Sequence, residues 1–156
     1  MIIAGKTPLE NRAIYICIDE VRACGDFSGR LVSVHLSEPV RFHSAGELAL
    51  VADRLLDAAG IAPRYEERRS FSSVGPPPQT RAKKEVTPHG VHFKEGACAT
   101  FEVRVYFRRN ATWQGEVRWI EQGEHEMFRS VMEMLRMMND AVTVEVETEL
   151  PQLAAN

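Results

Sequence analysis

Residues 99–142 have the sequence ATFEVRVYFRRNATWQGEVRWIEQGEHEMFRSVMEMLRMMNDAV and repeat the pattern of residues 13–56 without a gap. The two stretches are related by a constant offset of 86 positions, and seven of the 44 aligned pairs are identical. Self-similarity at a fixed offset is the sequence signature of a repeated structural unit. We therefore predict that the chain contains two copies of one unit. The identical pairs are Ala13/Ala99, Arg22/Arg108, Gly29/Gly115, Glu38/Glu124, Phe42/Phe128, Ser44/Ser130 and Glu47/Glu133.

Each copy opens with the pattern of a β-hairpin. Residues 13–21 form a nearly continuous apolar run, which is typical of a strand covered on both faces. After a glycine-containing turn, residues 30–36 alternate between apolar and polar side chains. In the second copy, residues 101–107 alternate in the same way and residues 110–115 form the turn. Residues 116–121 then form the second strand of the hairpin. The sequence thus predicts two strands in each copy.

A helix follows in each copy, and its start is encoded twice. Ser44 and Glu47 fit the S-x-x-E capping box, and so do Ser130 and Glu133. In this motif the serine accepts a hydrogen bond from a free backbone N–H at the helix start, and the glutamate reaches back to the N–H of the cap. A phenylalanine two positions before each serine is expected to pack against the core. Because the cap explains these residues, we assign them no catalytic role.

The remaining segments complete a single domain over residues 1–156. Residues 13–60 form the first unit, residues 61–98 a connector, and residues 99–149 the second unit together with a terminal strand. The predicted fold class is α+β, a tandem ββα repeat (ββα-ββα plus a C-terminal strand). We expect both helices on one face of its antiparallel sheet. The strands are apolar on one side and the helices carry broad apolar stripes, so these surfaces must pack against each other.

The connector and the C-terminal end have contrasting patterns. Residues 64–71 are charged and are expected to form a short strand. Residues 72–96 are rich in proline and glycine and poor in large apolar side chains, so we expect mobility around this part of the connector. Residues 143–149 alternate valine with glutamate or threonine, which predicts the terminal strand at an edge of the sheet.

Composition excludes several classes of protein. The 156 residues are 44% hydrophobic and carry a formal net charge of -3, which is typical of one globular domain and unlike a generic polyanion binder. No stretch approaches the length of a membrane-spanning helix, so no membrane partner is expected. The three cysteines form no CxxC pair. These features predict a reduced, cytoplasmic protein.

The sequence does not favour an enzyme, although it leaves the class open. It contains no G-x-S-x-G, G-x-x-x-x-G-K-[ST], G-x-G-x-x-G or H-E-x-x-H motif. His89 and His92 form an HxxH pair without a third metal ligand nearby. We therefore predict no catalytic residue, no metal and no cofactor.

The second hairpin carries the most suggestive surface. If its alternate apolar residues are buried, Arg104, Tyr106 and Arg108 face the opposite way. We expect a non-enzymatic binding or regulatory module whose partner is another protein or a second copy in a homodimer. The alternative is a single-stranded nucleic-acid-binding protein, because arginines between aromatic rings can bind phosphates and stack on bases. The predicted binding residues are Arg104, Tyr106, Arg108, Arg109, Trp113, Arg118 and Trp119.

The second copy also resembles a known group of sequences. Residues 107–115, Trp119 and residues 128–134 are similar to the pattern F-R-x-N-x-x-W-Q-G … W … F-R-S-x-x-E-L. This pattern is found in a family of short uncharacterised bacterial proteins. The resemblance covers residues 99–142 well and the first half loosely. It implies no activity, and no functional residue is carried over from it.

Overall fold

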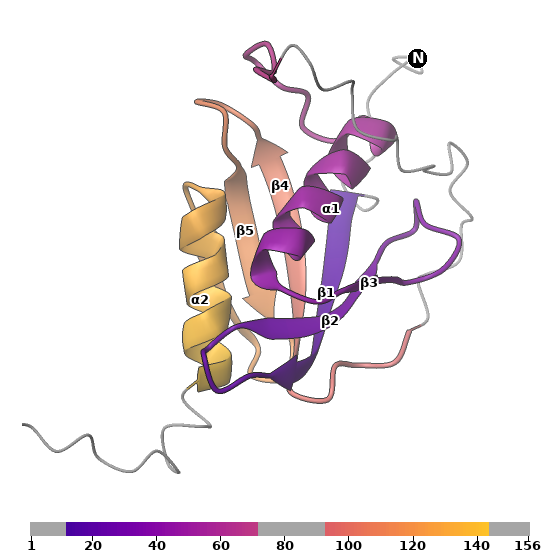
Figure 1. The fold of residues 1–156 in the computed structure, drawn as a ribbon, viewed down its shortest axis with the longest axis vertical. Coiled ribbons are helices and arrows are strands. Elements are labelled where there is room, and N and C mark those ends of the chain that lie inside the picture. The colour runs from indigo at the N-terminus through magenta and orange to yellow at the C-terminus, as the bar shows by residue number, and fades with distance from the viewer. Residues whose placement is uncertain (1–11, 72–92, 144–156) are drawn as a thin grey trace, which may run out of the picture.

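A computed structural model describes residues 12–71 and 93–143 of the chain (Figure 1). In this part each half contributes three strands followed by one helix. The strands of the first half are β1 (Ala13–Val21), β2 (Phe27–Val32) and β3 (Val40–Phe42), and its helix is α1 (Ala45–Ala59). The second half has β4 (Ala99–Phe107), β5 (Gln114–Trp119), β6 (Glu124–Phe128) and helix α2 (Val131–Thr143).

The six strands form one antiparallel sheet in the order β3-β2-β1-β4-β5-β6. The two halves therefore meet along β1 and β4, where Ile14 is paired with Val103. Strands β3 and β6 are the two edges. The predicted α+β class with an antiparallel sheet and two helices is confirmed.

The predicted number of strands is wrong, because each helix is preceded by a third strand. Strand β3 has only three residues, too few for an alternating pattern to be visible in the sequence. Strand β6 has the sequence EHEMF, and four of its five residues are exposed, so it lacks the apolar alternation of a half-buried strand. Of the expected strand at 64–71, the structure contains only an isolated bridge between Arg64 and Arg108. The expected terminal strand lies almost entirely outside the described residues.

Both helices pack on the same face of the sheet, where they enclose one hydrophobic core (Figure 1). This core joins inward side chains of all six strands to the buried faces of α1 and α2. No helix within residues 12–71 and 93–143 is long and apolar enough to cross a membrane. The largest fully buried side chains are Phe27, Phe42, Phe128, Ile14, Ile16, Ile18, Leu31, Leu48, Leu55, Leu56, Ile61 and Met134.

The predicted helix caps are present at both helices. The Oγ of Ser44 accepts a hydrogen bond from the N–H of Glu47 at 3.0 Å, and the Oγ of Ser130 accepts one from Glu133 at 3.1 Å. The carboxylate of each glutamate accepts a hydrogen bond from the backbone N–H of the residue before the serine, whereas the motif predicts the N–H of the serine itself. The phenylalanine two positions before each cap is buried, as expected.

We expect Ser44→Ala and Ser130→Ala each to lower the free energy of unfolding by about 1 kcal/mol, because each leaves a backbone donor at the helix start without its acceptor. Urea denaturation measures this change. Ser37→Ala removes an exposed serine outside either cap and is the control. Equal losses in the control and the cap variants would contradict the assignment.

Candidate functional site

A bulge in β4 divides the surface predicted on the second hairpin. Strand β4 pairs regularly with β5 up to Val105, and the register shifts between Val105 and Phe107. An extra residue reverses the side to which all later side chains point. Phe107 is consequently 48% exposed, while Arg108 is only 3% exposed. The predicted grouping of Arg108 with Arg104 and Tyr106 on one face is therefore wrong.

Arg104, Tyr106 and Arg118 do lie on the face turned away from the helices. Glu102 and Glu116 lie among them, because Glu102 is paired with Arg118 and Arg104 with Glu116 across the strands. The Nε of Arg104 donates to a carboxylate oxygen of Glu102 at 2.8 Å, and the Tyr106 hydroxyl donates to Glu116 at 3.0 Å. We call these five residues the open face. It carries two positive and two negative side chains around one phenol.

Two side chains of the open face, Tyr106 and Arg104, have shifted pKa values. Burial and the hydrogen bond to the Glu116 carboxylate raise the pKa of Tyr106 above the usual value for a phenol. Desolvation lowers the pKa of Arg104, but the Glu102 carboxylate outweighs it and holds that pKa above its usual value. At neutral pH Tyr106 is thus a neutral phenol and Arg104 stays charged.

The end of the connector covers the neighbouring part of this sheet face. The Phe93 ring lies 4.8 Å from the ring of Tyr15 on β1. The backbone N–H of Gly96 donates to the Thr100 hydroxyl at 2.9 Å, and Cys17 and Thr100 are both fully buried. On β4 and β5 the burial is uneven, because Arg118 is exposed whereas Glu102, Arg104, Tyr106 and Glu116 are half-buried.

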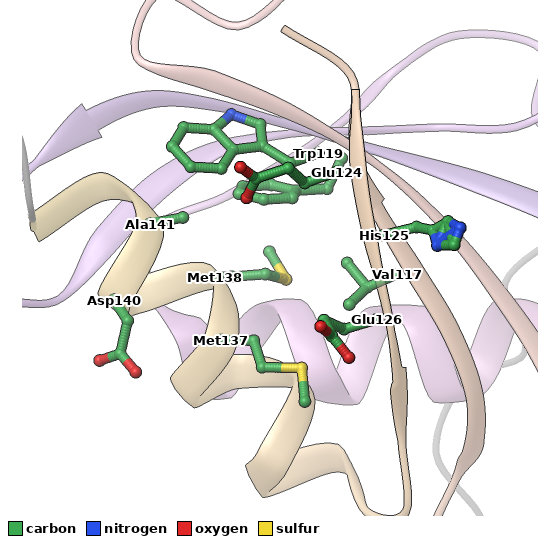
Figure 2. Close-up of a pocket in the computed structure, with 10 residues that line it drawn as sticks. Val117, Trp119, Glu124, His125, Glu126, Met137, Met138, Asp140 and Ala141 are labelled. Atoms are coloured by element: carbon green, nitrogen blue, oxygen red, sulfur yellow. The ribbon is translucent and has the colours of Figure 1, made fainter. Parts of the chain in front are cut away.

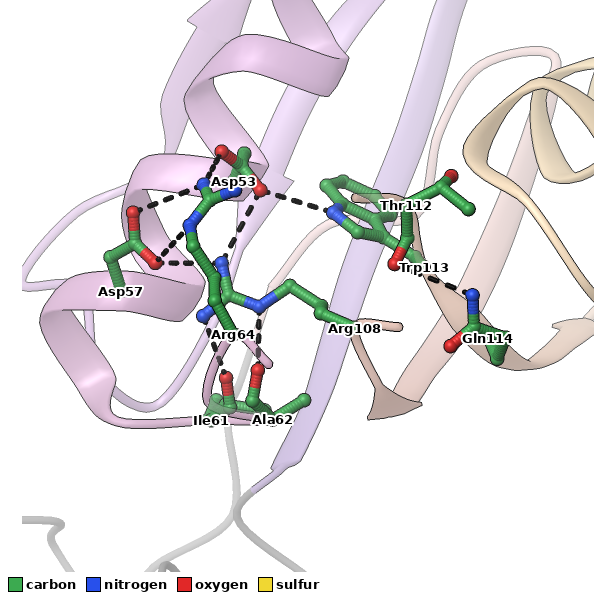
Figure 3. Close-up of polar contacts among 9 residues, drawn as sticks. All are labelled: Asp53, Asp57, Ile61, Ala62, Arg64, Arg108, Thr112, Trp113 and Gln114. Atoms are coloured by element: carbon green, nitrogen blue, oxygen red, sulfur yellow. Dashed lines mark hydrogen bonds and ion pairs between the residues drawn. The ribbon is translucent and has the colours of Figure 1, made fainter. Parts of the chain in front are cut away.

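Arg108 instead belongs to a polar cluster that joins the two halves of the chain (Figure 3). Its guanidinium donates to Asp57 at 2.7 Å and to Asp53 at 3.3 Å, both on α1, and also to the carbonyl oxygens of Ile61 and Ala62. Arg64 forms ion pairs with the same two aspartates. We call Asp53, Asp57, Arg64, Arg108 and Trp113 the arginine–carboxylate cluster.

Trp113 is also part of this cluster and is only 5% exposed. Its indole N–H donates to Asp53 at 3.1 Å. Burial raises the pKa of Asp57, but the hydrogen bonds and charges of Arg64 and Arg108 outweigh burial and hold that pKa below its usual value. Because their polar atoms are already engaged, Arg108 and Trp113 stabilise the fold, although both also line a pocket of about 550 Å³ beside the cluster.

Arg109 lies at the β4–β5 turn, where the connector contacts the hairpin. Its guanidinium is 4.8 Å from the ring centres of both Tyr65 and Phe107. The Glu66 carboxylate accepts hydrogen bonds from the backbone N–H groups of Asn110 at 2.7 Å and Ala111 at 3.3 Å. These contacts fix the start of the connector to the turn, away from Arg104 and Arg118.

Trp119 faces the helices and lines a pocket of about 330 Å³ between the β5–β6 edge and α2 (Figure 2). The Trp119 ring packs against Phe101, with 6.0 Å between the ring centres. Its indole N–H is buried without a hydrogen-bond partner among the described residues. Glu124 and Glu126 of β6 also line this pocket, and sequence reasoning did not identify them as site residues.

Two observations concern metal ligands and the buried thiol of Cys17. No group of three or more His, Cys, Asp or Glu side chains among residues 12–71 and 93–143 is placed to hold a metal ion. Burial raises the pKa of the Cys17 thiol to about 11, which leaves it a poor nucleophile at neutral pH. The HxxH pair, His89 and His92, lies outside the described residues.

No known protein family, curated protein or solved structure matches the chain. The resemblance of residues 99–142 to a family of short bacterial proteins therefore stays a prediction.

Proposed function

We propose that the protein is a non-enzymatic binding module that contacts another protein through the open face. The observation that carries this proposal is that Arg104, Tyr106 and Arg118 share one helix-free surface of β4 and β5, where Arg118 is exposed and the other two are half-buried. Tyrosine and arginine are enriched at the energetically important centres of protein interfaces, because they combine large contact area with hydrogen bonding. The charged neighbours would add specificity more than affinity.

The alternation of charge on the open face favours a second copy of this chain as the partner. On β4 the order is Glu102 then Arg104, and on β5 it is Glu116 then Arg118, so acid and base form a checkerboard. A two-fold symmetric interface places the same surface on both sides and must be self-complementary. Such a checkerboard can place each acid against a base of the other copy. We therefore propose a homodimer formed through this face.

Single-stranded nucleic acid is the second candidate, since Arg104, Arg118 and Tyr106 still share one helix-free face of the sheet. Two carboxylates on the same surface weigh against it, because they cancel the positive charge that attracts phosphates. A nucleic-acid ligand would bind less tightly as salt increases, and Arg118→Ala would reduce that slope.

Two further proposals concern the organisation and location of the chain. We propose that the halves are copies of one βββα unit, supported by strands β1 and β4 that begin at Ala13 and Ala99 and by capping serines at matching positions. We also propose a cytoplasmic location, supported by three free cysteines.

We expect Arg118→Glu and Tyr106→Ala each to weaken self-association at least about tenfold, as loss of an interface centre residue typically does. Sedimentation equilibrium measures this dissociation constant. Arg41→Glu is the matched control, because Arg41 is exposed on β3 at the far edge of the sheet. If the wild-type chain stays monomeric up to about 0.1 mM, the homodimer proposal fails, and titration with single-stranded DNA and RNA at low salt tests the second candidate.

A further inference from the structure

The pocket beside Trp119 has an apolar interior built from both layers of the fold (Figure 2). Phe101, Val117 and Trp119 form its wall on the sheet, and Met137, Met138 and Ala141 form its wall on α2. Its volume of about 330 Å³ falls at the lower end of the range for small-molecule sites, which begins at about 300 Å³. The pocket is therefore large enough for a small organic molecule.

The mouth of the pocket is strongly acidic. Glu124 is paired with Trp119 and Glu126 with Val117 across β5 and β6, so both glutamates lie on the same side of the sheet as the apolar wall. Figure 2 shows both of their carboxylates on the pocket side of β6. Asp140 of α2 also lines the pocket, but Figure 2 shows its carboxylate pointing away from the two glutamates.

These acids have no counter-ion in the described part of the chain. No described residue forms an ion pair or a hydrogen bond with the side chains of Glu124, Glu126 or Asp140. His125 lies between the two glutamates in sequence, but Figure 2 shows its ring pointing away from the pocket. Glu124 and Glu126, which have no ion-pair partner among the described residues, lie next to apolar walls and make the local potential negative, because the low-dielectric wall screens their charge less than water does.

We propose that this pocket is a binding site for a small organic ammonium ion with an apolar body. The ammonium group would pair with Glu124 and Glu126 at the mouth. The apolar body would enter between the rings of Phe101 and Trp119 and the methionines of α2. Aromatic faces attract cations, and methionine side chains adapt to ligands of irregular shape. An anion of the same shape would be repelled by the carboxylates.

A simpler role for Glu124 and Glu126 is protection of the sheet edge. Strand β6 is an edge strand, and charged side chains on such a strand discourage pairing with other chains. Edge protection requires charge but no cavity, so it predicts no saturable binding. The site is also on the helix side of the sheet, opposite the open face, so its test is independent of the proposed homodimer.

The test uses phenethylammonium as the probe and isothermal titration calorimetry or backbone amide NMR as the measurement. We expect saturable binding to the full chain, with shifts at Trp119, Val117 and Ala141. We expect the neutral analogue 2-phenylethanol to bind at least about tenfold more weakly and the anion 3-phenylpropionate not to bind, since only the ammonium pairs with the glutamates.

The variant Glu124→Gln/Glu126→Gln removes both charges while keeping side-chain size, and both residues are exposed, so folding is preserved. It should weaken phenethylammonium binding at least about tenfold, a difference of about 1.4 kcal/mol. Glu38→Gln is the matched control, because Glu38 is the exposed counterpart of Glu124 in the first half. Absence of saturable binding to the wild-type chain would overturn the proposal. So would equal binding of the alcohol, or undiminished binding to the double variant.

Discussion

Gly115→Ala and Gly29→Ala are expected to lower the free energy of unfolding by about 3 kcal/mol or more each, because neither site has room for a methyl group. A Cβ on Gly115 would lie 2.0 Å from the carbonyl oxygen of Arg104, and one on Gly29 would lie 1.8 Å from that of Cys17. Both obstacles are backbone atoms of the neighbouring strand. A side-chain rotation therefore cannot relieve the clash, and the strands must separate.

The tight fit at the two glycines comes from the bulges of the central strands. Gly29 is paired with Ile18, next to the bulge in β1, and Gly115 is paired with Val105, next to the bulge in β4. Bulges increase the local twist and bring backbones together, and glycine often marks such close approaches. On its other side each glycine is paired with the buried phenylalanine of the third strand.

Gly46→Ala is the matched control for these variants. Gly46 lies in the first turn of α1, where a Cβ would meet only the Ser44 hydroxyl at 3.9 Å. Alanine is the better helix former by up to about 1 kcal/mol, so this variant should be slightly more stable than the wild type. Urea denaturation of the three variants measures the contrast. A loss below about 1 kcal/mol for Gly115→Ala would contradict the close approach of β4 and β5.

Local sequence patterns predicted the elements that depend on local interactions. The capping boxes located both helix starts to within one residue, because each involves atoms only a few positions apart. Gly60, which ends α1 in the left-handed conformation at φ 68°, is a comparable local signal. Strands β3 and β6 were missed because they are stabilised by pairing with β2 and β5, which their own short sequences do not indicate.

The candidate site was predicted less well, because side-chain direction depends on register. Alternation along β4 correctly placed Arg104 and Tyr106 on the face away from the helices. The bulge after Val105 reverses the direction of the Arg108 side chain, which therefore lies in the arginine–carboxylate cluster. No local sequence pattern indicates that bulge. The proposed repeat did not indicate this position either. Arg22, the counterpart of Arg108, pairs at the surface with Asp26 at 3.1 Å.

The acidic pocket was not foreseen, since it requires two elements that only the fold brings together. Glu124 and Glu126 come from β6, and Met137 and Met138 come from α2. In the sequence EHEMF the two glutamates resemble ordinary solvated charges. Only their pairing with Trp119 and Val117 shows that they lie beside an apolar wall.

Arg108→Met should lower the free energy of unfolding by about 3 kcal/mol, because removing one partner leaves other buried polar groups without compensation. The carbonyl oxygens of Ile61 and Ala62 lose their donor, and Asp53 and Asp57 keep only Arg64 as a charge partner. Methionine preserves most of the apolar stem, so the change reports on the guanidinium itself. Arg109→Met is the control, because the side chain of Arg109 stacks on two rings at the exposed turn.

The same variant should change how stability depends on pH. The pKa of Asp57 is lowered in the folded chain, so its ionised form stabilises the fold above the pKa of the unfolded state, about 3.9. That contribution is lost as the pH falls through the lowered pKa. Without the Arg108 charge the pKa of Asp57 should rise, so the variant loses less free energy of unfolding on acidification than the wild type. The difference in free energy of unfolding between the two proteins should therefore become smaller as the pH falls. Urea denaturation between pH 7 and about pH 3 measures this difference. A difference that stays constant with pH would show that Arg108 stabilises the fold only through the two carbonyl oxygens.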